Sequence, residues 1–200
     1  MRHAIHLLFG LIFLSSCMPA PSPETDKVRC YGRFYADDYE SAWPACQRSA
    51  DYGHAVGKYL LGLMYVQGLS VPKDESRGIA LVRAAAEMGY GDAQNGYGIA
   101  LQHGLGVTQD IAQACLWWEK SALANNFLGQ QYLASCYLTG EGATEDPSRG
   151  FAYLLLSRDG GNKKAHELID SIRPEISALD QSRAEQIRRE LRDRIDKAHE

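Results

Sequence analysis

The sequence predicts an all-α fold, an α–α solenoid in which similar pairs of helices stack on one another. The first observation is a 36-residue step shared by two columns of residues: Gly32, Gly68, Gly104 and Gly140, and Asp38, Asp74, Asp110 and Asp146. The second is that apolar residues recur at three- and four-residue spacing twice within a period, as on two helices with one buried face each. The third is that glycine-bearing turns separate these two patterns. A repeat of this length is typical of a solenoid.

Composition narrows the class of protein. The chain has 200 residues, of which 45% are hydrophobic and 23% charged, so whole-chain disorder is excluded. The formal net charge is -4, which gives no electrostatic basis for a nucleic-acid partner. The 19 glycines and the odd number of cysteines, five, require an explanation from the individual segments.

Residues 1–16 have the features of a bacterial export signal: a short basic start, an apolar run over residues 4–14, and two serines. The apolar run is too short to span a membrane, which takes about 20 apolar residues. The sequence Leu-Ser-Ser-Cys at residues 14–17 resembles the lipobox of bacterial lipoproteins. The resemblance implies cleavage before Cys17 and a diacylglycerol on its sulfur. The alternative is an ordinary secretory signal with a chance cysteine.

Residues 17–28 contain three prolines among polar residues and predict an extended, lipid-attached tether. The residue after the lipid-bearing cysteine is Met18. In enterobacterial lipoproteins, an aspartate at this position favours retention in the inner membrane. The lipoprotein resemblance therefore implies a protein of the bacterial cell envelope that faces the periplasm, at the outer rather than the inner membrane.

Residues 29–173 form the predicted solenoid. Aspartate at the start of the second helix of each unit accepts hydrogen bonds from free N–H groups, and Asn125 or Gly161 ends a helix in the left-handed conformation. Gly62, Gly98 and Ala134 recur inside helices at one register, which predicts close helix crossings there. Pro44 should bend the helix that contains it.

The residues of the repeat resemble the Sel1-like repeat, a relative of the tetratricopeptide repeat. Three successive units match the family pattern at these positions: Ala55, Leu61, Gly62, Tyr65, Gly68, Val71, Asp74; Ala93, Tyr97, Gly98, Gly104, Gly106, Asp110, Trp117; Leu133, Tyr137, Gly140, Gly142, Asp146, Gly161. The resemblance implies a right-handed superhelix of about three repeats with a partial N-terminal unit. Ser70 replaces the second turn glycine of the first unit, which implies a strained or altered turn.

Residues 174–200 contain no glycine and predict a C-terminal capping helix that covers the open end of the solenoid. Pro174 should kink the preceding helix, and the last helix should start at Asp180 or at Ser182. Five residues mark its apolar side: Ile176, Leu179, Ile187, Leu191 and Ile195. A partner-binding helix or a dimer seam is the alternative.

Four cysteines remain once Cys17 carries lipid, and three pairings are open to them. Cys115 and Cys136 each lie about ten residues from the turn near Asn125, so two antiparallel helices place them at the same height. The Cys115–Cys136 disulfide is therefore favoured, and the Cys30–Cys46 disulfide follows mainly by elimination. Buried free thiols are the alternative.

The sequence shows no specific catalytic, metal-binding or cofactor-binding pattern, so we expect a non-enzymatic protein. Its histidines lack zinc-ligand spacing, and no GxSxG or Ser-x-x-Lys motif is present. The pair Trp117-Trp118 is interpreted as core packing, with stacking on a sugar or base as the alternative.

The resemblance to tetratricopeptide relatives implies a concave face lined by the first helix of each unit. Carried over by register, nine positions face a partner there: Tyr59, Leu63, Gln67, Asn95, Ile99, Gln102, Gln131, Ser135 and Thr139. We therefore expect a periplasmic scaffold or adaptor for an unknown envelope protein or peptide. The alternatives are a solvated face without a partner, binding of envelope carbohydrate (peptidoglycan or exopolysaccharide), and a β-lactamase-like activity, which some cysteine-rich Sel1-like relatives imply.

Overall fold

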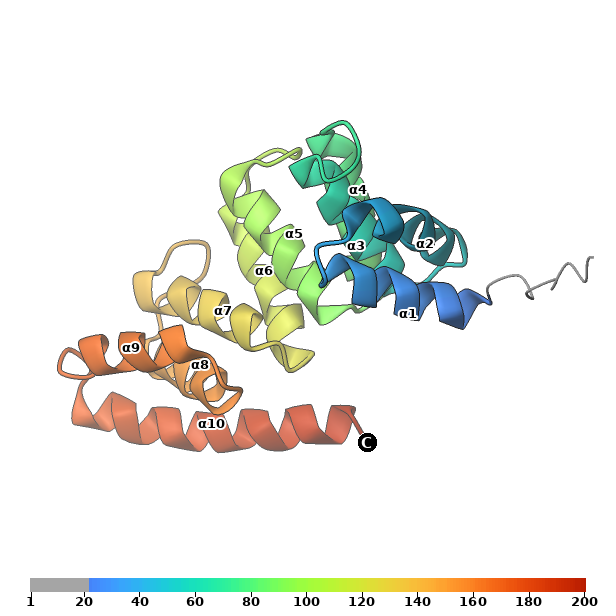
Figure 1. Ribbon diagram of the computed structural model, residues 1–200. Helices are drawn as coiled ribbons and strands as arrows, with labels where there is room; N and C mark the ends of the chain where they lie inside the picture. The colour runs from blue at the N-terminus through green and yellow to red at the C-terminus, as the bar shows by residue number, and fades with distance from the viewer. Residues whose placement is uncertain (1–21) are drawn as a thin grey trace, which may run out of the picture.

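The computed structural model describes residues 22–200, so the signal peptide predicted at residues 1–16 and the lipid site at Cys17 lie outside the described residues. The described residues form ten α-helices (Figure 1): α1 (Pro23–Phe34), α2 (Tyr39–Asp51), α3 (Ala55–Gln67), α4 (Glu75–Glu87), α5 (Gly91–His103), α6 (Ile111–Leu123), α7 (Phe127–Thr139), α8 (Pro147–Asp159), α9 (Lys163–Ile172) and α10 (Ala178–Ala198). The all-α prediction is confirmed. None of these helices is long and apolar enough to cross a membrane.

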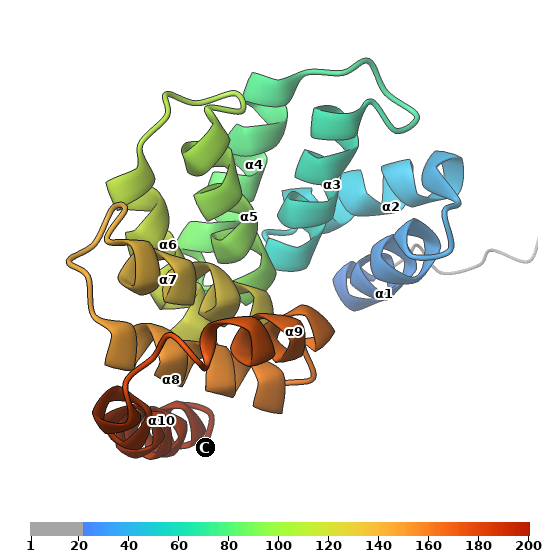
Figure 2. The same cartoon turned by 90° about the vertical axis from the view of Figure 1, so that its left-hand side faces the viewer.

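The helices stack in chain order into a curved array. Each helix packs against the next from α1 to α9, and α10 packs against α8. In Figure 2, the odd-numbered helices α3, α5 and α7 line the inner side of the curve, and the even-numbered helices α4, α6 and α8 form the outer side. The array is the expected helix-pair solenoid, in which each unit buries its apolar face against its neighbours.

The two residue columns of the 36-residue repeat are helix caps. Gly68, Gly104 and Gly140 end α3, α5 and α7 in the left-handed conformation, with φ of 74°, 68° and 69°. The aspartate carboxylates each accept a hydrogen bond from the backbone N–H three residues further on, at the starts of α2, α4, α6 and α8: Asp38, Asp74, Asp110 and Asp146. Ser70 occupies the left-handed region at φ 57°, where the later units have Gly106 and Gly142.

The N-terminal unit departs from the sequence prediction in two ways. Helix α1 begins at Pro23, so residues 23–28 are not part of an extended tether, and the prediction is wrong for them. The reason is a long-range ion pair: the fully buried Asp26 carboxylate accepts two hydrogen bonds from Arg48 of α2, both at 2.8 Å. Gly32 lies inside α1 instead of in a turn, because only residues 35–38 link α1 to α2. The left-handed residue of that short link is Asp37.

Small residues allow the helices to cross closely. A Cβ on Gly62 of α3 would lie 2.7 Å from the carbonyl oxygen of Gly78 in α4. A Cβ on Gly98 of α5 would lie 2.5 Å from the indole nitrogen of Trp118 in α6. Trp118 is 1% exposed, and Trp117 is half-buried. The predicted close crossings are present, and one tryptophan of the pair is a core residue.

The C-terminal segment covers the last repeat, as expected, but its details differ. Helix α9 ends at Ile172, before Pro174, so the proline follows the helix and does not kink it. Helix α10 starts at Ala178, because the Ser177 hydroxyl accepts from the Asp180 N–H as its N-cap. Leu179 is 79% exposed, and Ala184 is buried in place of a fifth large apolar residue. The predicted start at Asp180 or Ser182 is wrong by a few residues.

Two disulfides join neighbouring helices, in the pairing that the sequence predicts. Cys30–Cys46 links α1 to α2 with a Cα–Cα distance of 4.6 Å. Cys115–Cys136 links α6 to α7 with a Cα–Cα distance of 6.2 Å. The first lies in a core cluster formed by α1, α2 and α3, and the second lies in the larger cluster that continues to α10.

Candidate functional site: the inner face of the solenoid

Helices α3, α5 and α7 form the inner face. The nine predicted residues on it differ in the solvent exposure of their side chains. Gln67, Ser135 and Thr139 are exposed. Four positions are half-buried: Tyr59, Leu63, Ile99 and Gln102. Asn95 and Gln131 are buried, at 6% and 9% exposure. The accessible positions among the nine are therefore uncharged, and they combine polar side chains with the apolar Leu63 and Ile99.

Two of the nine side chains form hydrogen bonds within the chain, and a third, that of Asn95, is buried. The Gln131 side-chain oxygen accepts a hydrogen bond from Asn162 at 2.7 Å, which joins α7 to the start of α9. The Thr139 hydroxyl donates to the Ser135 backbone carbonyl at 2.9 Å. Asn95 is covered, and its backbone carbonyl accepts from the Trp118 indole at 3.3 Å. Gln131 therefore joins neighbouring helices, whereas the Thr139 bond stays within α7. The buried Asn95 side-chain oxygen has no hydrogen-bond partner among residues 22–200.

Tyr90, which the sequence did not assign to the inner face, lies beside the predicted Tyr59. The Tyr59 and Tyr90 rings meet edge to face with centroids 5.4 Å apart. Burial raises the pKa of both hydroxyls, and the negative charge of Asp92 raises each pKa further. The Asp92 carboxylate accepts from the Asn126 side chain at 2.6 Å. Both tyrosine hydroxyls therefore stay protonated at neutral pH, as hydrogen-bond donors.

The 36-residue repeat could have identified Tyr90 as a residue of the inner face. Tyr90 and Asn126 are 36 residues apart, and both are N-caps of inner helices, as are His54 and Asn162. The Asn126 and Asn162 side chains accept from backbone N–H groups, whereas Tyr90 makes no such bond and contributes an aromatic surface instead.

A serine column holds neighbouring repeats together. The Ser121 hydroxyl donates to the Gly91 carbonyl at 2.8 Å, and the Ser157 hydroxyl donates to the Phe127 carbonyl at 2.6 Å. Ser49, earlier in the same column, lies 3.4 Å from the His54 ring. Because all three serines are buried between helices, these contacts are structural. In residues 22–200, no group of three His, Cys, Asp or Glu residues is placed to hold a metal ion.

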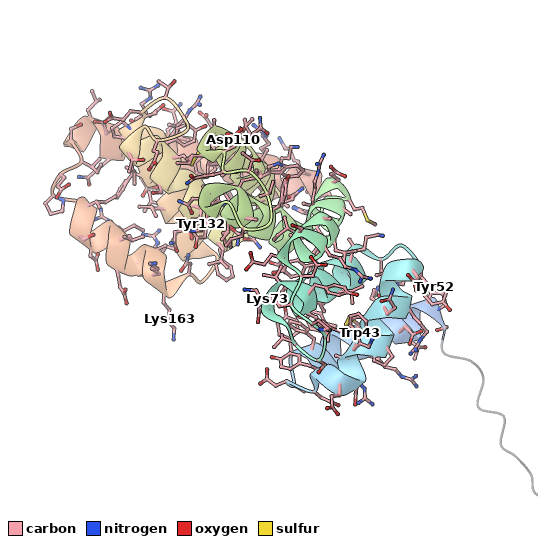
Figure 3. The ribbon with its side chains drawn as sticks, turned by 90° about the horizontal axis from the view of Figure 1, so that it is seen from above. Trp43, Tyr52, Lys73, Asp110, Tyr132 and Lys163 are labelled. Atoms are coloured by element: carbon pink, nitrogen blue, oxygen red, sulfur yellow. A yellow bond between two sulfur atoms is a disulfide. The ribbon has the colours of Figure 1, made fainter. Side chains whose placement is uncertain are left out.

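An aromatic surface also lies at the turn between α3 and α4. The Trp43 and Tyr65 rings meet edge to face, with centroids 5.4 Å apart, and the Arg77 guanidinium stands 4.1 Å over the Tyr65 ring. A hollow of about 390 Å³ opens here, and Figure 3 shows Trp43 near Lys73 at its rim. The tyrosine–arginine pair recurs 72 residues later as Tyr137 and Arg149.

Comparison with known proteins identifies the class of this fold. The model of the Sel1 repeat matches residues 55–90, 91–126 and 128–162, together more than half of the chain. The chain therefore belongs to the Sel1 repeat family. A putative Sel1-like repeat-containing protein of Acanthamoeba polyphaga mimivirus is 34% identical over 73 residues, which are 36% of this chain and 14% of that protein.

Two solved structures share the architecture. A protective antigen of uropathogenic Escherichia coli strains, described as displaying an SLR fold, is 25% identical, with a TM-score of 0.69 over 76% of this chain and 33% of that one. A Sel1 repeat protein from Oxalobacter formigenes is 24% identical, with a TM-score of 0.67 over 76% of this chain and 46% of that one. This chain thus spans less than half of either structure. The predicted solenoid of Sel1-like repeats is confirmed.

Proposed function

We propose that this Sel1-repeat scaffold is a lipid-anchored periplasmic protein that binds another envelope protein on its inner face. The observation that carries the proposal is the composition of the accessible inner face, where apolar Leu63 and Ile99 lie among uncharged polar residues. Such a surface suits an extended peptide or a helix, because apolar anchors supply burial and the polar side chains supply hydrogen bonds.

Two features support a rigid, exported scaffold. The disulfides Cys30–Cys46 and Cys115–Cys136 join adjacent helices, and disulfides persist in oxidising compartments such as the periplasm. Each closes a loop of 16 or 21 residues, for which chain-entropy arguments give about 3 kcal/mol. A rigid face loses little conformational entropy on binding, which favours affinity. The anchoring at Cys17 rests on the lipobox-like sequence alone.

Site-specific photo-crosslinking in cells tests the interaction. A photoreactive amino acid at Gln67 or Ser135, both exposed on the inner face, should capture a discrete protein partner. The same amino acid at Ala80, exposed on α4, is the matched control. Equal capture from both faces, or co-sedimentation with purified peptidoglycan without any captured protein, would contradict the proposal in favour of carbohydrate binding or a solvated face.

Metabolic labelling tests the anchor separately. The chain should incorporate an alkyne-tagged fatty acid and fractionate with the outer membrane, whereas the Cys17→Ser variant should carry no label and appear in the soluble periplasmic fraction. Label on the Cys17→Ser variant, or an unlabelled soluble wild type, would refute lipidation at this residue. Either result leaves the protein-binding proposal to be judged by the crosslinks.

A further inference from the structure

A cleft on the outer side of the solenoid lies between α10 and the helices α6 and α8. It has a volume of about 540 Å³, within the range of ligand sites. Helix α10 forms one wall of the cleft and is longer than α8, which it covers. Arg188 of α10 contacts Asp159 at the end of α8, and α10 continues beyond this point to Ala198 (Figure 1). The last turns therefore extend past α8, where Ile195 is 1% exposed and Arg194 lines a hollow with residues of α6.

Three arginines line this cleft: Arg149, Arg183 and Arg194. Arg149 forms a 3.5 Å ion pair with Asp146, but within residues 22–200 neither Arg183 nor Arg194 has a carboxylate oxygen within 4 Å. Arg188, between them on the same helix, contacts both Glu185 and Asp159. The cleft thus holds unpaired positive charge on a chain whose formal net charge is -4.

The floor of the cleft is aromatic and apolar. The Tyr137 and Tyr153 rings stack with centroids 6.0 Å apart, and Ile187 and Leu191 line the α10 side. Burial raises the pKa of Tyr153 to about 12, so its hydroxyl is a donor at neutral pH. Glu119 and Arg194 line the same cleft as Tyr153; the negative charge of Glu119 raises the pKa of Tyr153 and the positive charge of Arg194 lowers it.

A second hollow of about 420 Å³ continues the cleft along α6 and shares Glu119 and Arg194 with it. Its apolar lining includes the half-buried Trp117 and Leu116, which is 51% exposed. Because the two hollows share Glu119 and Arg194, we describe them as one groove. Its lining includes both arginine and apolar side chains. Glu119 and Glu190 lie in the same groove and would repel a uniformly charged polyanion.

We propose that this groove binds an acidic peptide segment in which carboxylates alternate with apolar side chains. The carboxylates pair with Arg183 and Arg194, since guanidinium groups bind carboxylates in a bidentate manner. The apolar side chains cover Leu191 and the exposed Leu116. The site is separate from the inner face and does not depend on what that face binds.

The test measures binding of a fluorescein-labelled peptide of alternating leucine and aspartate to the purified full-length chain in detergent. An Arg183→Gln/Arg194→Gln double variant should weaken binding by about tenfold or more, the effect of losing a charge-assisted hydrogen bond. The matched control is Arg189→Gln/Arg192→Gln, which removes the same charge from α10 residues that do not line either hollow. The control should bind within about twofold of wild type.

Three results would overturn the proposal. They are equal losses in both double variants, equal binding of a leucine–asparagine peptide, and tighter binding of an oligogalacturonate, which carries carboxylates on a saccharide. Circular dichroism of both double variants checks that the fold is intact. Crosslinking from Gln67 on the inner face should be unchanged by Arg183→Gln/Arg194→Gln, so failure of this proposal and failure of the proposed scaffold function are distinguishable.

Discussion

The close contact between α5 and α6 yields a quantitative prediction from two glycines of one helix. Gly98 and Gly96 both lie inside α5, so replacing either with alanine gains the same helix propensity, about 1 kcal/mol. A Cβ at Gly98 lies 2.5 Å from the Trp118 indole nitrogen and 2.8 Å from two of its ring carbons. A Cβ at Gly96 meets its nearest atom, on Tyr59, at 3.4 Å.

Trp118 cannot easily move away from an added methyl group. It is 1% exposed, it stacks on Tyr132 with centroids 4.9 Å apart, and it donates to the Asn95 carbonyl. Overpacking of this kind costs about 1–3 kcal/mol. Because propensity cancels between the two variants, Gly98→Ala should be less stable than Gly96→Ala by about 1–3 kcal/mol.

Urea unfolding followed by tryptophan fluorescence and circular dichroism measures this difference. With a slope of about 2 kcal/mol per molar urea, the midpoint of Gly98→Ala should lie about 0.5–1.5 M below that of Gly96→Ala. Gly96→Ala itself should equal or exceed the wild type. Coincident midpoints for the two variants would refute the packing argument, because the expected difference rests on the contact of the added Cβ with Trp118.

Three further predictions concern the bonds between helices. Asp26→Asn should destabilise the chain by about 1.5–3 kcal/mol at pH 7. The hydrogen bond from Arg48 lowers the pKa of Asp26, so this stabilisation is present above the ordinary aspartate pKa and is lost as pH falls through the lowered value. The melting temperatures of variant and wild type should therefore converge at low pH. A difference in melting temperature that stays constant with pH would contradict the role of Asp26. Ser121→Ala removes the bond to the Gly91 carbonyl and should cost about 1–2 kcal/mol in urea unfolding, whereas Ser135→Ala on the exposed inner face should be neutral. Replacing both cysteines of the Cys115–Cys136 disulfide with serine should cost about 3 kcal/mol, and reductant should then have a smaller effect on the variant than on the wild type.

Much of the fold was predictable because its signals act over a few residues. An aspartate that caps a helix binds an N–H three residues away, and a glycine that ends one needs only its own positive φ. Gly32 shows the limit of that argument: it occupies the glycine column but lies inside α1, because a four-residue link replaces the longer turn. The column identified the repeat but could not give the length of this link.

The sequence predicted which residues share the inner face, but it did not predict how deeply each side chain is buried. The sequence assigned Asn95 and Gln131 to the inner face, but both are buried there, and Asn162 donates a hydrogen bond to the Gln131 side chain. The outer groove had no sequence signal, since it depends on Arg149 of α8 and Arg194 of α10 lining one cleft. Neither residue belongs to a motif that indicates binding.

The sequence by itself determined that the chain is a stack of helix pairs and which residues cap them. These properties follow from local hydrogen bonding and from a period that repeats. Only the tertiary structure decided that residues 23–28 join the fold through Asp26 and Arg48, that the inner face is partly covered, and that α10 leaves an arginine-lined groove open. The physical reason is that burial and unpaired charge depend on how distant helices pack, and the spacing of residues along the chain does not specify that packing.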